Sequence, residues 1–283
     1  MDLGGFNITI VGLGLIGGSY AKALRKMNPK RLWAIDKDPL TIKKAEEAKV
    51  IDFSGLELKY ILSESDLIIM ALYPKDTIKF IEENMEYFKP GSIITDICGL
   101  KANVISKVNE ILRNDVEFVG GHPMAGKELS GFDNADGSIF ENANYFLTPT
   151  SRNKKETLAF IEKLIIALGC KKPILISAED HDRIIAYTSH LPHILAVSLI
   201  NCFTPEKHLK SLIGGSFKDA TRVASLNRNL WLELIKTNKD NVVNILDCFI
   251  NNLMELKYAI LNGDDEKLLQ EFNLASNRRK ELE

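Results

Sequence analysis

Short apolar runs alternate with longer amphipathic stretches along residues 1–176 of the chain. The short runs read "NITIV", "LWAI", "DLIIMAL", "SIITD" and "EFVGG", and their length and β-branched content are typical of buried strands. The stretches between them have helical periodicity and cover residues 16–27, 39–48, 76–87 and 102–112. This alternation predicts an α/β domain with a mainly parallel, doubly wound sheet. The runs "NYFLTP" and "PILIS", with a helix over residues 154–168 between them, are expected to complete the sheet.

The strand pattern stops after "SAEDHD", and residues 177–283 predict one helix after another. The longest apolar-periodic segments lie around residues 184–203, 229–236 and 241–261. An all-α domain this short carries more apolar side chains than its own helices can cover. We therefore expect a homodimer that forms through the C-terminal helices.

The charge balance narrows the classes of partner. The 283 residues include 36 Lys and Arg against 38 Asp and Glu, which gives a formal net charge of -2. This balance provides no long-range attraction to nucleic acid or to an anionic membrane. The longest apolar stretch, residues 184–203, is interrupted by His190, Pro192 and His193, which disfavours a membrane span. The N-terminus runs almost directly into a strand, so we expect no signal sequence and a cytoplasmic location.

The cysteines predict neither a metal site nor a disulfide framework. They stand far apart, with no C-x-x-C and no Cys/His ligand spacing, at Cys98, Cys170, Cys202 and Cys248. We interpret them as reduced thiols.

A glycine-rich turn follows the first predicted strand. In "ITIVGLGLIGGSYAKAL", Gly12, Gly14 and Gly17 have the spacing G-x-G-x-x-G between a strand and a helix. In this context the first glycine makes the tight turn, the second lets backbone approach a pyrophosphate, and the third lets the helix pack on the strand. The N-terminus of that helix then faces the phosphates. The pattern predicts a Rossmann-type dinucleotide site that also includes the neighbouring Leu13, Leu15 and Ile16.

The second strand ends in "LWAID", which places Asp36 about twenty residues beyond the glycine turn. A carboxylate at this position accepts hydrogen bonds from the adenosine ribose and repels the 2′-phosphate of NADP. We therefore expect NAD as the cofactor. Lys37 is the one neighbour that favours NADP instead, because an ammonium there could contact the 2′-phosphate.

The stretch "GGHPMAGKELSG" places His122 where the fifth predicted strand runs out. Ligands of open doubly wound sheets lie beyond the carboxyl ends of the strands. Pro123 favours an extended conformation for the histidine, and the ordinary pKa of imidazole suits proton transfer at neutral pH. His122 is therefore a candidate acid–base group; the alternative is a turn residue with no chemical role.

A second group of polar residues interrupts the apolar helix in "AEDHDRIIAYTSHLPHILAV". Ser189 and His193 are four residues apart and share a helix face, and His190 lies about 100° away around the axis. Pro192 lacks the N–H that would bond the carbonyl of Thr188, so we expect a kink there. The pattern indicates a polar pocket. Satisfied core or interface histidines are the alternative, and no acidic or cysteine side chain completes a metal site at helical spacing.

A third segment, "GGSFKDATRVA", brings Lys218 and Arg222 to one helical face. An Arg side chain binds a carboxylate through two parallel hydrogen bonds. The segment predicts a local anion site. The alternative is a solvated pair bridged to Asp219 or Glu233.

Together these segments resemble the prephenate dehydrogenase family of tyrosine biosynthesis over nearly the full chain. The resemblance rests on "VGLGLIGGSYAKAL", "DICGLK", "GGHPMAGKELSGFDNADGSIFENANYFLTP", "HDRIIAYTSHLPH" and "GGSFKDATRVA", in the family's order and spacing. It implies NAD-dependent oxidative decarboxylation of prephenate to 4-hydroxyphenylpyruvate.

The resemblance also implies roles for individual residues. His122 matches the histidine that accepts the hydrogen bond of the C4 hydroxyl, Arg222 matches an arginine that binds a substrate carboxylate, and His193 matches a substrate-pocket histidine. Further pocket positions are Ser189, His190, His181, Lys101, Glu128 and Trp231. The segment expected to run along the cofactor is Ala71, Leu72 and Tyr73.

Two positions depart from the family pattern. Gly99 stands where many members carry a serine two residues before the lysine, so a hydroxyl that would orient the histidine is absent. A water or Ser130 could take its place. Lys127 stands where Thr or Ser is common, which affects recognition of the side-chain end of the substrate.

Three other functions stay open at this point. Arogenate could replace prephenate, because His122 and Arg222 serve both substrates. A β-hydroxyacid or imine-reducing dehydrogenase joins similar domains but relies on a catalytic Lys or Asp. A nucleotide-sensing regulatory subunit would bind NAD without turnover, and Gly99 keeps that alternative open.

Overall fold

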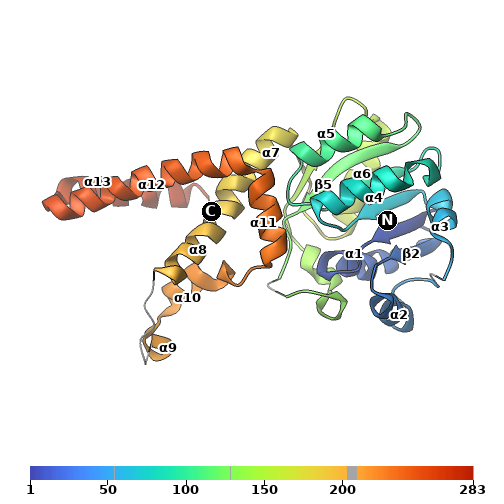
Figure 1. Cartoon of the computed structure of the whole chain (residues 1–283), viewed down its shortest axis with the longest axis horizontal. Helices are drawn as coiled ribbons and strands as arrows, with labels where there is room; N and C mark the ends of the chain where they lie inside the picture. Colours follow the sequence, from blue (N-terminus) through green and yellow to red (C-terminus); the bar gives the residue numbers. More distant parts are fainter. Residues whose placement is uncertain (54, 128, 203–208, 283) are drawn as a thin grey trace.

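The computed structural model describes residues 1–53, 55–127, 129–202 and 209–282. An α/β part, which contains all the strands of these ranges, lies beside a helical part that extends away from it (Figure 1). The last strand ends at Leu175 and the first helix of the helical part begins at Ala178.

The described strands form one seven-stranded sheet in the order β2-β1-β3-β4-β5-β6-β7. Neighbouring strands are parallel except β5 and β6, which run antiparallel. The strands are β1 (Asn7–Val11), β2 (Arg31–Ile35), β3 (Leu67–Met70), β4 (Ile93–Asp96), β5 (Glu117–Pro123), β6 (Tyr145–Thr148) and β7 (Ile174–Leu175). The expected mainly parallel, doubly wound sheet is confirmed, because β2 and β3 flank β1 while the chain continues outward from β3.

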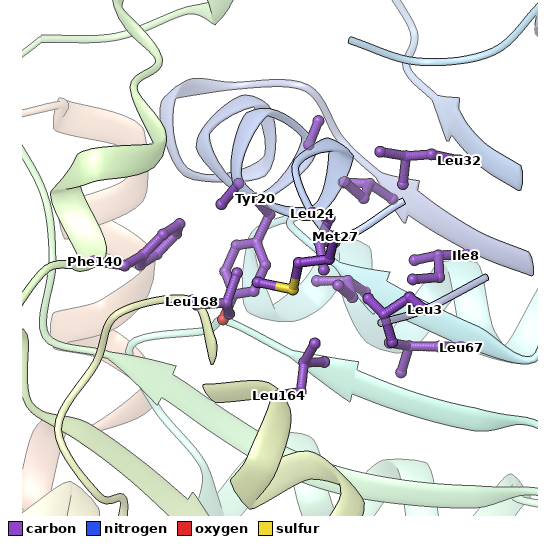
Figure 2. Packing of buried hydrophobic residues seen from close by; sticks show 14 of the residues in the cluster. Leu3, Ile8, Tyr20, Leu24, Met27, Leu32, Leu67, Phe140, Leu164 and Leu168 are labelled. Atoms are coloured by element: carbon purple, nitrogen blue, oxygen red, sulfur yellow. The ribbon is translucent and has the colours of Figure 1, made fainter. Parts of the chain in front are cut away.

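Helices cover both faces of this sheet. They are α1 (Leu15–Arg25), α2 (Pro39–Glu47), α3 (Leu58–Glu64), α4 (Pro74–Asn84), α5 (Ala102–Ile111) and α6 (Lys155–Ala167). Successive side chains of a strand point to opposite faces, so Leu67 and Ile69 join one core cluster while Ile68 and Met70 join the other. The first cluster packs strand residues against α1 and α6, as Figure 2 shows for Tyr20 and Leu164. Strands buried on both sides explain why their sequences read as continuous apolar runs.

The second part is all-α, as predicted. Its helices are α7 (Ala178–Ile185), α8 (Leu191–Asn201), α9 (Leu209–Leu212), α10 (Gly215–Thr221), α11 (Arg228–Thr237), α12 (Lys239–Asn262) and α13 (Asp265–Lys280). Helices α12 and α13 pack on each other and extend away from the sheet (Figure 1). Gly263 adopts φ 63° at the turn between them, which ends α12 in the left-handed conformation that glycine favours.

The kink expected at Pro192 is a π turn rather than a bend alone. Residues Ala186–His190 form a π-helical turn between α7 and α8, and the N–H of Leu191 donates to the carbonyl of Ala186, five residues back. A π turn widens the helix where the proline ring would collide with a preceding carbonyl. As a result, His190 lies on the π turn and His193 lies in the first turn of α8 directly after it.

Candidate active site

The glycine turn between β1 and α1 has the shape that a dinucleotide requires. Gly12 has φ 97°, and a Cβ there would lie 2.5 Å from the carbonyl oxygen of Ala71. A Cβ on Gly17 would lie 1.9 Å from the carbonyl oxygen of Gly12, whereas one on Gly14 would meet nothing within 4 Å. Gly12 and Gly17 are therefore needed for the turn and for helix packing, and Gly14 leaves open space above the backbone. No side chain caps the N-terminus of α1, so its first N–H groups are available to an anion.

Asp36 directly follows the last residue of β2, beside this turn. Its Oδ2 accepts a hydrogen bond from the backbone N of Leu13 at 2.6 Å, and its Oδ1 accepts one from the N of Asp38 at 2.9 Å. A carboxylate has about four acceptor positions, so each oxygen keeps one for a ribose hydroxyl. The residues present therefore fit NAD at this edge of the sheet.

The segment that follows β3 contacts the helical part of the chain. Asn227 donates from Nδ2 to the hydroxyl of Tyr73 at 2.8 Å. Glu233 accepts a hydrogen bond from the backbone N of Lys75 at 2.8 Å and so caps the start of α4. The segment Ala71–Tyr73 thus lies between the glycine turn and α11.

His122 lies near the carboxyl end of β5, opposite Phe146 of β6. Its Nδ1 is 2.9 Å from Nε2 of His181 on α7. Burial of the ring, followed by the positive charge that His181, Lys101 and His190 would place near it, holds the pKa of His122 well below its usual value. The imidazole is therefore neutral at pH 7, as a proton acceptor must be.

Asp182 is the next member of this chain of hydrogen bonds. Nδ1 of His181 lies 2.8 Å from Oδ1 of Asp182, and both side chains are buried. The same carboxylate accepts hydrogen bonds from the backbone N of Lys101 at 2.8 Å and of Ala102 at 3.0 Å. Asp182 thus caps α5 from the helical part of the chain.

Lys101 lies beneath the histidine rather than in the pocket. Its side chain is fully buried, and its ammonium pairs with Asp96 and donates to the carbonyl oxygen of Gly121 at 2.7 Å. Asp96 also accepts a hydrogen bond from the N of Gly121 at 3.0 Å. In this structure the ammonium of Lys101 is paired with Asp96, and Lys101 holds the backbone that carries His122.

Two further histidines gather around Trp231 of α11. The ring of His193 lies over the indole at a centroid distance of 3.9 Å, and the ring of His190 meets its edge at 5.7 Å. His193 donates from Nδ1 to the carbonyl oxygen of Ser189 at 2.8 Å, which leaves its Nε2 as an acceptor in the neutral ring. Burial lowers the pKa of His193 and lowers that of His190 to about 4. Both imidazoles around Trp231 are therefore neutral at pH 7.

Asn238 connects the two groups of histidines. Its Nδ2 donates to the carbonyl oxygen of Asp182 at 2.8 Å and lies 3.5 Å from Nδ1 of His190. No local pattern predicted a role for Asn238, which is 56 residues from Asp182. Asp182 itself was also missed, although its position next to His181 at the start of a helix is a signal that could have found it.

Arg222, Glu128 and Lys127 are the remaining residues that the resemblance placed near the substrate. Arg222 is exposed on the 3₁₀ turn Arg222–Ala224, which packs against α8, the helix that carries His193. Glu128 lies outside the described residues. Lys127 is exposed with its ammonium 3.4 Å from a carboxylate oxygen of Asp136. Among the residues that the structure describes, no group of three or more His, Cys, Asp or Glu side chains could hold a metal ion.

Gly99 leaves room for a side chain. A Cβ at this position would meet only the methyl groups of Leu234, at 3.6 and 3.9 Å, which is ordinary van der Waals contact. The glycine is therefore not required by the backbone or by packing. The exposed Ser130, expected as one replacement for the missing hydroxyl, has a carbonyl oxygen that accepts from Asn134 at 2.8 Å.

The fold and this site define a two-domain, nucleotide-binding oxidoreductase with a cluster of histidines at the carboxyl edge of its sheet. The chain belongs to the prephenate dehydrogenase family: its residues 20–172 match the family's nucleotide-binding domain and its residues 177–274 match the family's dimerization domain.

Relatives of known identity agree with this membership. The prephenate dehydrogenase of Bacillus subtilis is 32% identical over 281 residues, which cover 97% of this chain and 76% of that protein. The crystal structure of prephenate dehydrogenase from Aquifex aeolicus with hydroxyphenyl propionate and NAD+ superimposes with a TM-score of 0.89 at 28% identity and covers 100% and 99% of the two chains. The Synechocystis arogenate dehydrogenase superimposes with a TM-score of 0.84 at 28% identity and covers 98% and 99%.

Proposed function

We propose that this protein oxidises and decarboxylates prephenate to 4-hydroxyphenylpyruvate. NAD, when bound, supplies the acceptor for the two electrons that leave C4 of the substrate. The observation that carries the proposal is the state of His122: it is neutral, lies at the carboxyl edge of the sheet, and has one ring nitrogen engaged by His181. Family membership and the similarity to the Bacillus subtilis enzyme support prephenate as the substrate.

His122 accepts and then returns the one proton that is transferred in the reaction. It accepts the proton of the C4 hydroxyl as C4 becomes carbonyl-like, and returns it to the phenol oxygen when the ring carboxylate leaves as carbon dioxide. No net proton is consumed, and aromatisation provides the driving force. The other task of the protein is to hold the substrate against the cofactor in a reactive geometry.

The proposed substrate-binding groups come from the π turn and α8 and from the 3₁₀ turn that packs against α8. Arg222 binds a substrate carboxylate through its guanidinium fork. His193 offers Nε2 as an acceptor from the pocket wall, because its Nδ1 is bonded to the carbonyl of Ser189. His190 stays neutral and shapes the pocket together with Trp231. Glu128 keeps its proposed role as a pocket residue on the resemblance alone.

Asp36 supports NAD rather than NADP. The N–H groups of Leu13 and Asp38 hold its carboxylate beside the glycine turn. In such folds a carboxylate at this position accepts a hydrogen bond from the 2′-hydroxyl of the adenosine ribose. Lys37 is exposed, and the two hydrogen bonds that hold the carboxylate of Asp36 come from Leu13 and Asp38.

Exchange of His122 for Asn tests the catalytic proposal. We expect turnover to fall by about 10²–10⁴-fold while NAD affinity is unchanged, because a general base contributes about that factor and the residue does not belong to the nucleotide site. The wild-type protein is assayed at 340 nm with NAD and either prephenate or arogenate in parallel. Wild-type protein that binds NAD and oxidises neither substrate would contradict the proposal and favour a sensing role.

Arogenate is the second candidate substrate. It is favoured by the close superposition on the Synechocystis arogenate dehydrogenase, and His122 and Arg222 would serve both substrates equally. Lys127 is the residue that could separate them, because an ammonium near the side-chain end of the substrate repels the amino group of arogenate but not the keto group of prephenate. Turnover of arogenate alone in the parallel assay would replace the first proposal by this one.

We further infer a homodimer through the helical part. Large apolar side chains remain exposed on its last two helices at Ile250, Leu253, Met254, Tyr258, Ile260, Leu261, Leu269, Phe272 and Leu274. Surfaces of this kind on a soluble chain mark an interface. A molar mass of twice 31.7 kDa by light scattering supports this inference, and a monomer at micromolar concentration contradicts it.

The run Ala178–Asn201 is long and apolar enough to cross a membrane by length and composition, with 28% of its most apolar window buried. We propose that it stays in the cytoplasm with the rest of the chain. Its residues His181 and Asp182 hydrogen-bond to the α/β part, and insertion into a bilayer would break those bonds. Fractionation of cells that express the protein tests this: recovery in the membrane pellet would contradict it.

A further inference from the structure

We propose that Asp182, acting through His181, fixes the tautomer of His122 so that its Nε2 is the unprotonated atom presented to the substrate. His181 and Asp182 are then positioning residues for the base. The inference rests on the proposed function of His122, and deepens it by naming what prepares the base for its task.

The first step concerns His181. The carboxylate of Asp182 can only accept hydrogen bonds, and Nδ1 of His181 lies 2.8 Å from its Oδ1. In a neutral His181 ring the proton is therefore on Nδ1. Its Nε2 then carries a lone pair and can only accept.

The second step concerns His122. Its Nδ1 lies 2.9 Å from that lone pair, so Nδ1 must be the donor of this hydrogen bond. A neutral imidazole has one N–H, which leaves Nε2 of His122 as an acceptor. This is the atom that a base needs. The opposite tautomer would offer an N–H to a hydroxyl whose proton has to leave.

The surroundings of His122 keep its ring in the neutral state that this assignment requires. The charged and titratable groups that face His122 are His181 of α7, Lys101 before α5 and His190 of the π turn, and each would oppose a positive charge on the ring. Phe146 of β6 covers the pair, with centroid distances of 6.4 Å to His122 and 5.4 Å to His181. A resting imidazolium is therefore disfavoured.

The same hydrogen bonds also stabilise His122 after it has taken up the substrate proton. When His122 takes the substrate proton, its ring becomes positive and its Nδ1–H remains bonded to His181, whose own N–H points to the carboxylate of Asp182. A buried carboxylate at the end of such a chain orients the base and stabilises its charged form, as in the Ser-His-Asp arrangement of hydrolases.

Asp182 is itself held in place from three directions. Its two oxygens accept the N–H groups of Lys101 and Ala102 at the start of α5, where the helix dipole stabilises the carboxylate. Its carbonyl accepts from Asn238. Rotation of the carboxylate away from His181 would leave buried N–H groups unpaired, so the orientation is determined by the fold.

Asp182→Asn is the decisive variant. An amide nitrogen in the place of Oδ1 offers a proton to Nδ1 of His181 and no longer accepts from the N–H of Lys101, while the amide oxygen still accepts from the N–H of Ala102. His181 then carries its proton on Nε2, donates to Nδ1 of His122, and forces the His122 proton onto Nε2. We expect kcat to fall by about 10²–10⁴-fold with KM for prephenate and affinity for NAD within about threefold of wild type.

Asp180→Asn is the matched control. Asp180 lies two residues away on the same helix, is exposed, and bonds only Ser177 and Arg183 in the described contacts. Its exchange should leave kcat unchanged. Equal losses in the two variants would overturn the proposal.

The tautomer itself is read from ¹H–¹⁵N correlation spectra of the histidine rings, without substrate or cofactor. The wild type should show a protonated Nδ1 and an unprotonated Nε2 for His122, and Asp182→Asn should show the reverse. An unchanged His122 spectrum in a folded Asp182→Asn variant overturns the proposal. Because this measurement needs no turnover, it stays informative if the protein oxidises neither substrate, which would refute the proposed function alone.

His181→Gln against His181→Phe provides a second comparison should Asp182→Asn fail to fold. A glutamine oxygen can accept the N–H of His122 and keep the tautomer, whereas phenylalanine keeps only the packing against Phe146. We expect the Gln variant to retain at least tenfold more activity than the Phe variant. Equal activity in the two would overturn the proposal.

Discussion

The buried ion pair under the catalytic strand provides a sharp quantitative test. Lys101 and Asp96 both have fully buried side chains, and the ammonium also donates to the carbonyl of Gly121. Exchange of Lys101 for Met keeps the approximate volume but removes the charge, so the carboxylate of Asp96 loses its counter-ion inside the core.

The expected loss of stability follows from these contacts. Removal of one member of a buried pair costs about 3–5 kcal/mol. The lower end applies here, about 3 kcal/mol, because Asp96 keeps hydrogen bonds from the backbone N of Gly121 and of Cys98, each at 3.0 Å. The carbonyl of Gly121 loses its donor, which adds about 1 kcal/mol. The sum of about 4 kcal/mol corresponds to a fall in Tm of about 8–16 °C for a chain of this size.

Urea denaturation followed by circular dichroism measures this difference, with Lys89→Met as control. Lys89 pairs with Asp66 at 2.5 Å, but the two side chains are 39% and 26% exposed, so the control should lose about 1 kcal/mol or less. The double variant Asp96→Asn/Lys101→Met should be more stable than Lys101→Met alone, because it contains no unpaired buried charge. A loss below about 1 kcal/mol for Lys101→Met, or a double variant less stable than the single one, would refute this reasoning.

Three further outcomes are expected. Asp36→Ala should weaken binding of NAD far more than binding of NADP in a fluorescence titration, and equal weakening would refute the assignment of Asp36 to the ribose. Gly99→Ser should fold normally, because a side chain at this position meets only Leu234 at van der Waals distance, and should raise kcat/KM by about 2–10-fold relative to Gly99→Ala if its hydroxyl bonds the C4 oxygen; no difference between the two variants would refute a role for that hydroxyl. Stability should decrease as the pH falls below about 6.5, because the pKa of His122 is lowered and that of His190 is lowered to about 4, so the unfolded chain binds protons that the folded chain does not. Each histidine contributes at most about 1.4 kcal/mol per pH unit in that window, and urea midpoints that do not change between pH 7 and pH 5 would contradict the sign.

Local patterns were sufficient to predict much of the fold. The glycine turn, Asp36 and the strand runs are each determined by neighbours within a few residues, so periodicity and spacing identified them. The position of His122 at a strand end followed from the same pattern. The helix Leu58–Glu64 was not predicted, and Leu209–Leu212 and Asp265–Lys280 were predicted only as part of a helical region without bounds, since the first two are brief and the last has a mainly polar sequence.

The connections among the site residues could not be predicted in the same way. The bond from Asp182 to Lys101 spans 81 residues, and that from Asn238 to Asp182 spans 56. Such contacts depend on how two domains dock, which no local periodicity encodes. Lys101 illustrates the consequence: the family resemblance implied a pocket position, and no local pattern predicted its burial against Asp96.

The capping of α5 by Asp182 also limits where this chain can be joined to a relative in a chimaera. The base is on the α/β part, whereas the carboxylate that determines its protonated nitrogen comes from the first helix of the other part, and that carboxylate is seated on the start of α5. A chimaera that joins the α/β part to the helices of a relative must therefore inherit the His181–Asp182 pair and the start of α5 as one unit. A crossover point placed within residues 101–182 would separate them, even if each half folded well.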